Sequence, residues 1–143
     1  MATILAAPPE RVWPWLVQMG GGRAGWYSWD WLDNNAEPSA DRIVPEWQNL
    51  EVGRHLKGPT NWWIVVALEP NRTLVLQSSY GLLTSRSFDP RSDLRPRAYV
   101  DGIWSFHLRP AAGGRTRLVI RTRSRSRPRL FARPFALVIS PRR

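Results

Sequence analysis

The segment WPWLVQMGGGRAGWYSWDW, residues 13–31, decides our interpretation of the fold. It contains five of the nine tryptophans, and three consecutive glycines divide it into two parts. Before the glycines, Val12, Leu16 and Val17 follow helical spacing, and Pro14 is expected to bend that helix because it removes a backbone donor. The glycines then end the helix. We therefore expect a large apolar element around which the downstream strands wrap.

The residues on either side of this segment extend the pattern. Residues 2–6 predict a first strand, and Pro8 and Pro9 suit a helix start, since proline is tolerated in the first helical turn. After the glycines, Ser28 is expected to cap a second short helix that runs to about Asn34. Residues 34–41 are polar and turn-rich, which predicts a loop.

The middle of the chain has the composition of strands. Residues 62–69 are β-branched and aromatic, and residues 73–80 are expected to pair with them as an antiparallel hairpin across the turn EPNR. Weaker strand signals occur at residues 53–57 and 85–88. Residues 98–108 predict a long strand with one face formed by Val100, Trp104, Phe106 and Leu108. Ser105 and His107 lie on its other face.

The segment RTRLVIRTRSRSR, residues 115–127, alternates with a period of two. Arginines occupy the odd positions except 119, and smaller or apolar residues occupy the even ones, which predicts a strand with an outward arginine face. The alternative is a disordered nucleic-acid-binding tract. The unbroken alternation favours the strand. Residues 130–140 then predict a closing helix, kinked at Pro134.

Charge is distributed very unevenly along the chain. The net charge is +10, yet residues 1–108 hold ten basic and eleven acidic side chains, whereas residues 109–143 hold eleven arginines and no acid. Such asymmetry is typical of proteins that contact nucleic acid or an anionic membrane. The side chains expected to make such a weak contact are Arg115, Arg117, Arg121, Arg123 and Arg125. The alternative is a solvated strand face.

Composition limits the remaining functions. The chain has no cysteine and only two histidines, 55 and 107, so we expect no disulfide, no metal site and no cofactor. No apolar run reaches ~18 residues, and residues 1–10 lack the basic start of a signal peptide. We therefore expect one cytoplasmic domain, residues 1–143, with no transmembrane segment.

Several motifs resemble the START-like, or SRPBCC, superfamily. They are the opening ILAAPPERVWPWLVQMG (residues 4–20), GRAGWYSWDWLDN (22–34), RIVPEWQNLEVG (42–53), LEPNRTLVL (68–76) and TRLVIRTR (116–123). The resemblance implies an α+β helix-grip fold, in which a curved antiparallel sheet with a short N-terminal helical pair surrounds a C-terminal helix and a hydrophobic cavity. Members bind lipids, polyketides and other apolar molecules, and a minority are cyclases or dehydratases. Residues 130–140 give only about three helical turns, so the closing helix is short or truncated and the groove is expected to be partly open.

The resemblance and the aromatic content together favour a binder of small apolar ligands. We expect the cavity to be lined by Trp26, Tyr27, Trp62, Ile64, Tyr80, Trp104, Phe106, Leu118, Ile120 and Thr122. The alternative is a cyclase-like enzyme that moves protons with Tyr80, Asp101, His107 or an inward arginine, although no spacing singles these residues out. The pair Asp30 and Asp33 fits the end of a helix better than acid–base chemistry. We therefore expect no catalytic residues.

Overall fold

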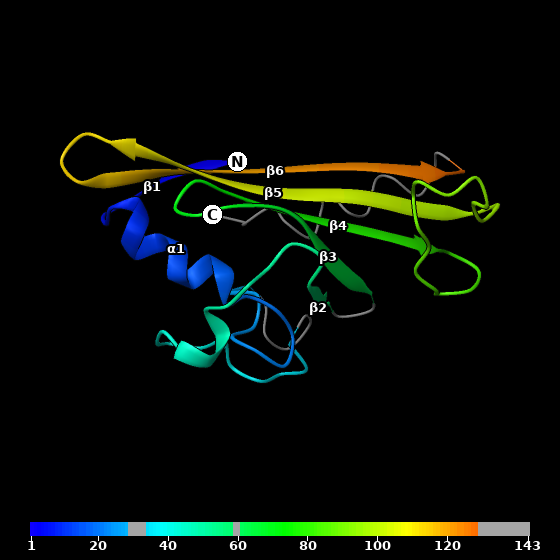
Figure 1. Cartoon of the computed structure of the whole chain (residues 1–143), viewed down its shortest axis with the longest axis horizontal. Coiled ribbons are helices and arrows are strands. Elements are labelled where there is room, and N and C mark those ends of the chain that lie inside the picture. Colours follow the sequence, from blue (N-terminus) through cyan, green and yellow to red (C-terminus); the bar gives the residue numbers. More distant parts are fainter. Residues whose placement is uncertain (29–33, 59–60, 129–143) are drawn as a thin grey trace.

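The computed structural model describes residues 1–28, 34–58 and 61–128. Their main element is one antiparallel sheet of six strands in the order β1-β6-β5-β4-β3-β2 (Figure 1). The elements in chain order are β1 (Ala2–Leu5), α1 (Pro9–Val17), the 3-10 helix η1 (Pro45–Trp47), β2 (His55–Lys57), β3 (Trp62–Glu69), β4 (Thr73–Gly81), β5 (Tyr99–Ala111) and β6 (Arg115–Arg127). The first strand pairs with the last, which brings residues distant in sequence together.

Turn residues explain two hairpins of the sheet, β3 with β4 and β5 with β6. The turn between β3 and β4 has Asn71 at φ 60°, a left-handed conformation that asparagine adopts more readily than most residues. Between β5 and β6 the chain turns at Gly113 and Gly114, with φ of 73° and 66°. The predicted hairpin of residues 62–69 with 73–80 is therefore confirmed, and the arginine-alternating segment 115–127 is confirmed as a strand.

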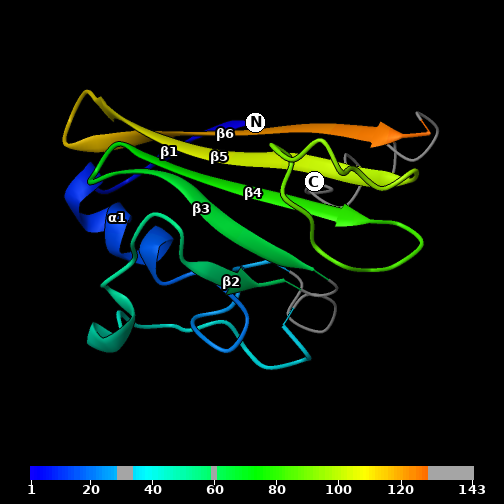
Figure 2. The same cartoon turned by 45° about the vertical axis from the view of Figure 1, so that its right-hand side comes forward.

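The hydrophobic core lies between one face of the sheet, called the inner face here, and the N-terminal segments. Leu74, Leu76 and Val65 of the inner face are fully buried, and Leu16 and Val17 of α1 pack against the same cluster. In both views, α1 and the loops that follow it lie on one side of the sheet and toward one end, while the other end of β4, β5 and β6 extends past α1 (Figures 1 and 2). The structure thus leaves part of the inner face uncovered by its α-helix.

The helix-grip α+β class is wrong for this chain. Helical structure in the described residues is limited to the nine residues of α1 and the three of η1, and the sheet dominates. After α1, Gly20 and Gly25 exchange backbone hydrogen bonds of 2.9 and 3.0 Å, so the glycine run forms a tight loop. Tyr27 follows at φ 53°, outside the right-handed helical region. Residues 20–27 therefore form a loop.

The structure tests some of the remaining predicted elements, and others fall on residues that it does not describe. The strand at residues 2–6 is confirmed as β1, and the helix at the two prolines as α1, which contains Pro14. Residues 85–88 form only an isolated bridge, Ser87 with Tyr80. The second short helix after Ser28 and the closing helix at residues 130–140 fall on residues 29–33 and 129–143, outside the described ones. None of the described helices is long and apolar enough to cross a membrane.

We expect Leu76→Ala to lower the free energy of unfolding by about 2–5 kcal/mol, because it leaves a cavity in a fully buried site of the central strand β4. Urea unfolding would measure it. The matched control is Leu94→Ala, at a position that is 88% exposed, where a change within about 0.5 kcal/mol is expected. Equal effects of the two substitutions would contradict the assigned core.

Candidate functional site

Strand register places a row of aromatic residues on the inner face. Directly opposed residues of an antiparallel pair point to the same side of the sheet. Trp104 is opposite Leu76 of β4 and Thr122 of β6, and the next row contains Phe106 opposite Leu74 and Ile120. On β3, Trp63 precedes Val65, which is opposite Leu76. Tryptophan and phenylalanine side chains from two strands therefore meet on this face.

A fourth aromatic ring reaches these residues from the loop after α1. The indole of Trp26 stacks on that of Trp104, with ring centroids 5.6 Å apart and an interplanar angle of 25°. Trp63 and Phe106 flank Trp104, at centroid distances of 5.7 and 4.8 Å. We call Trp26, Trp63, Trp104 and Phe106 the aromatic cluster. Trp104 is its centre, because it contacts each of the other three rings.

Two donors in the aromatic cluster have no acceptor. The indole N–H groups of Trp26 and Trp104 are both buried, and neither has a hydrogen-bond partner among the described residues. A buried donor without a partner costs about 1–3 kcal/mol relative to a satisfied one. Most buried polar groups in proteins are satisfied, so an exception calls for an explanation. Two such donors on stacked rings leave the aromatic cluster with hydrogen-bonding capacity that the described residues do not use.

The inner face next to Trp104 is accessible from the β6 side. Thr122, directly opposite Trp104, is exposed, and so is Ser124, although both lie on the inner face. Trp104 itself is half-buried. By contrast, Phe106 and Leu108, nearer to α1, are buried. Exposure on the inner face is thus limited to the β6 side of Trp104, because Val100 and Ser126 farther along the same face are buried again.

The structure brings together most of the residues predicted to line the cavity. On the inner face, register groups Tyr80, Trp104, Phe106, Leu118, Ile120 and Thr122, and Trp26 packs against this face. Three predicted residues lie elsewhere, namely Tyr27, which packs against Trp15, and two residues of β3. Ile64 is opposite Gln77 and Trp62 opposite Lys57, so both are on the outer face, and Trp62 is 49% exposed. Their places on the inner face are taken by Trp63 and Val65.

The sequence carries only a weak signal for which side of β3 faces the core. The run WWIVV is apolar at every position, so alternation does not show which side faces the core. The pairing of β3 with β4 also shifts register between Val65 and Ala67, which breaks the period of two within the strand. The exposed position of Trp62 therefore follows from tertiary pairing.

A buried glutamine, which sequence reasoning did not identify, positions Tyr27. Gln18 is fully buried, and its side-chain amide donates to the Tyr27 hydroxyl oxygen at 2.7 Å and to the Arg42 carbonyl at 3.0 Å. Its Oε1 accepts from the Val44 backbone N–H at 3.0 Å and from the Gln48 side chain at 3.2 Å. The network joins the end of α1 to the segment that contains η1. It also holds the Tyr27 ring against Trp15, with the two ring centroids 6.0 Å apart. Tyr27 is therefore not part of the stack of Trp26 on Trp104.

The side chains proposed for proton transfer do not converge. Asp101 lies on the outer face, where its carboxylate accepts from Gln77 at 3.0 Å and Ser79 at 2.8 Å. His107 is on the same face, within 3.3 Å of the Thr73 hydroxyl, whereas Tyr80 is on the inner face. In the described part of the chain, no group of three or more histidine, aspartate or glutamate side chains could hold a metal ion.

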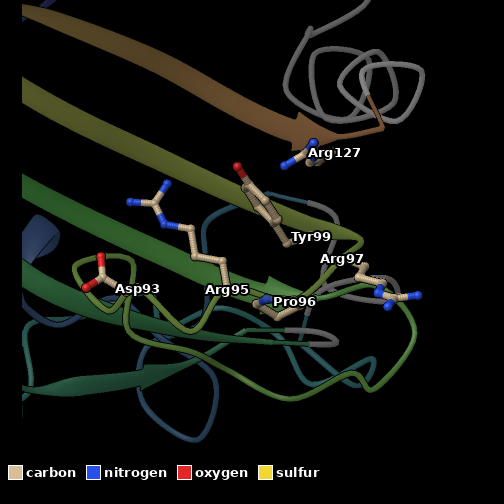
Figure 3. Close-up of a pocket in the computed structure, with 6 residues that line it drawn as sticks. All are labelled: Asp93, Arg95, Pro96, Arg97, Tyr99 and Arg127. Atoms are coloured by element: carbon tan, nitrogen blue, oxygen red, sulfur yellow. The ribbon is translucent and has the colours of Figure 1, made fainter.

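Arginines make the outer side of β6 strongly basic. Arg121, Arg123, Arg125 and Arg127 are exposed, and none forms an ion pair with another described residue. Near the end of β6, a pocket of about 490 Å³ is lined by Asp93, Arg95, Pro96, Arg97, Tyr99 and Arg127. Figure 3 shows Arg95 and Arg97 pointing away from one another, with the Tyr99 ring between Arg95 and Arg127. The arginines of this pocket do not converge on one anion.

No protein-family model, curated protein or solved structure matches this chain. The resemblance to the START-like superfamily therefore stays a prediction. The geometry of the described residues is the main guide to function, and its most specific feature is the aromatic cluster with two unpaired indole donors.

We expect two tyrosines to titrate late. Burial raises the pKa of Tyr80 and of Tyr27 above the ordinary value of 10.0, and the hydrogen bond from Gln18 opposes this only in part at Tyr27. The unfolded chain then loses these protons first, so stability is complete below pH 10.0 and falls as the pH rises through the folded-state pKa values. Tyrosinate absorbance of the folded protein measures the shift.

Tyr80→Phe should remove one late-titrating component from that absorbance curve and leave the other. The control is the same titration in concentrated urea, where both phenols are expected to titrate at their ordinary pKa. Titration of the folded protein that coincides with the titration in urea would contradict the burial of both phenols.

Proposed function

We propose that this protein binds a small, mainly apolar molecule that carries a hydrogen-bond acceptor, against the aromatic cluster of the inner face. The observation that carries the proposal is the pair of buried, unpaired indole N–H groups on Trp26 and Trp104. A ligand carbonyl or ether oxygen can accept from an indole N–H, while the ligand's apolar body contacts the rings. Sites of this kind combine apolar walls with a few placed polar groups.

The neighbouring residues support a flat ligand body. Tyr80 and Trp104 contribute half-buried rings on the inner face, and Thr122 and Ser124 contribute exposed hydroxyls beside them. A molecule lying across these residues would cover apolar rings and retain polar contacts at its edge. The resemblance of residues 4–20 and 22–34 to START-like proteins implies the same class of ligand.

A cyclase-like activity has less support than binding. Such an enzyme needs acid or base groups within hydrogen-bond reach of the bound molecule. Asp101 and His107 lie on the outer face, so the sheet separates them from Tyr80 and from the aromatic cluster. The proposal therefore includes binding without catalysis.

The test compares two probes that differ in one acceptor. We expect α-tetralone, a bicyclic aromatic ketone, to bind more tightly than tetralin, which has no oxygen, by on the order of tenfold in Kd. Isothermal titration calorimetry measures both. In Trp104→Phe the ring remains aromatic but the N–H is lost, so the preference for α-tetralone should shrink.

Trp62→Phe is the matched control, because Trp62 lies on the outer face and is exposed. It should leave both affinities unchanged. Equal binding of the two probes, or binding of neither, would contradict the proposal. A preference for α-tetralone that Trp62→Phe abolishes and Trp104→Phe leaves intact would place the site on the other face.

A further inference from the structure

Strand β6 is an edge of the sheet over half of its length. The short strand β1 pairs only with residues 116–119, and the backbones of Ile120 and Met1 exchange two hydrogen bonds of 2.9 Å. Beyond Ile120, no described strand lies on that side of β6, as the short β1 beside the long β6 shows (Figure 1). In the described part of the chain, the backbone groups on that side of residues 121–125 pair with no strand, and Thr122 and Ser124 are exposed.

The direction of each backbone group follows from Ile120. Its N–H and C=O both point toward Met1, away from β5. Backbone groups of a strand alternate in direction, so those of Thr122, Ser124 and Ser126 also point away from β5. The Arg121 carbonyl points the other way, since it accepts from the Ser105 hydroxyl of β5. Unpaired strand groups of this kind are a template for another strand.

The side chains along this edge differ sharply between the two sides of the sheet. Arg121, Arg123 and Arg125 are exposed on the outer side, and Thr122 and Ser124 are exposed on the inner side. The one carboxylate of β5 opposite the arginine row, Asp101, is bonded to Gln77 and Ser79. The arginines have no acidic partner among the described residues.

We propose that the edge of β6 binds an extended acidic segment of a partner protein by strand addition. Acidic residues at alternate positions of that segment would lie opposite the arginines on the outer side. Small polar or apolar residues between them would lie beside Thr122 and Ser124. The added backbone would pair with the groups of Thr122 and Ser124, which are the exposed inner-face positions of this edge. Main-chain bonds supply affinity in this mode of recognition, and side chains supply specificity.

A second copy of the chain does not fit this edge. Antiparallel pairing of two β6 edges about Ser124 would place Arg123 opposite Arg125 and Arg121 opposite Arg127, all on the same side. Like charges directly opposite one another are destabilising. A nucleic acid or a lipid surface would satisfy the arginines but leave the backbone groups of the edge unpaired. An acidic strand satisfies both sets of groups.

Binding is tested on the full chain with a fluorescein-labelled peptide that alternates glutamate and threonine, using fluorescence anisotropy at low ionic strength. Ser124→Pro removes a backbone N–H that points to the edge and leaves the ladder with β5 intact. It should weaken binding on the order of tenfold, whereas Ser124→Ala, which retains the N–H, should not. Circular dichroism checks that both variants are folded.

The peptide offers a control that does not depend on folding of a variant. Methylation of the threonine nitrogens keeps every charge but removes the donors that would face β6, so it should weaken binding as strongly as Ser124→Pro does. Arg123→Glu combined with Arg125→Glu should abolish binding of the glutamate peptide and allow binding of the corresponding lysine peptide. These results would support strand addition.

Other outcomes overturn the proposal. If the methylated peptide, or a peptide with the same composition in separate glutamate and threonine blocks, binds as tightly, the contact is electrostatic without a strand ladder. If a single-stranded oligonucleotide binds and the alternating peptide does not, the arginine row is a nucleic-acid surface. Binding is independent of the aromatic cluster, so Trp104→Phe should leave it unchanged.

Discussion

The pairing of β5 with β6 is the constraint on which both surfaces of this protein depend. Both strands have 13 residues, and every residue of one is opposite a residue of the other. If the pairing of β5 with β6 shifted by one position, either Arg121 and Arg123 would turn toward the core side of the sheet or Trp104 would turn away from it. Burying unpaired guanidinium groups is costly, so this register is strongly favoured. It holds the aromatic cluster inward and the arginines outward.

Sequence was a good guide to strands and a poor guide to architecture. The limits of β3 and β6 matched because turn residues such as Pro70 and Gly113 end apolar or alternating runs, and these are local properties. The helix-grip class failed because the described residues contain only the short helices α1 and η1 beside a six-stranded sheet. The structure has loop at Gly20 to Tyr27, where backbone hydrogen bonds and positive φ values replace helical geometry.

The candidate site was predicted in part, for a comparable reason. Trp104, Phe106, Ile120 and Thr122 were grouped correctly because alternation in β5 and β6 is clear. Trp62 was assigned to the wrong side of the sheet, since every residue around it is apolar. The role of Gln18 had no local signal, because its partners Tyr27, Arg42 and Val44 come together only in the folded chain. The unpaired indole donors likewise depend on tertiary packing.

The contact between β1 and β6 has a consequence for how the protein folds. The Met1 amine and the Ile120 carbonyl are separated by 119 positions in sequence. During synthesis at about 5–20 residues per second, β1 has no strand to pair with for on the order of ten seconds after it leaves the ribosome. Closing so long a loop is entropically unfavourable, so β1 joins late, after β3 to β6 have formed their local hairpins. Until then, the edge of β6 that β1 later occupies is open, and the alternating arginines of β6 disfavour its pairing with the same strand of another chain.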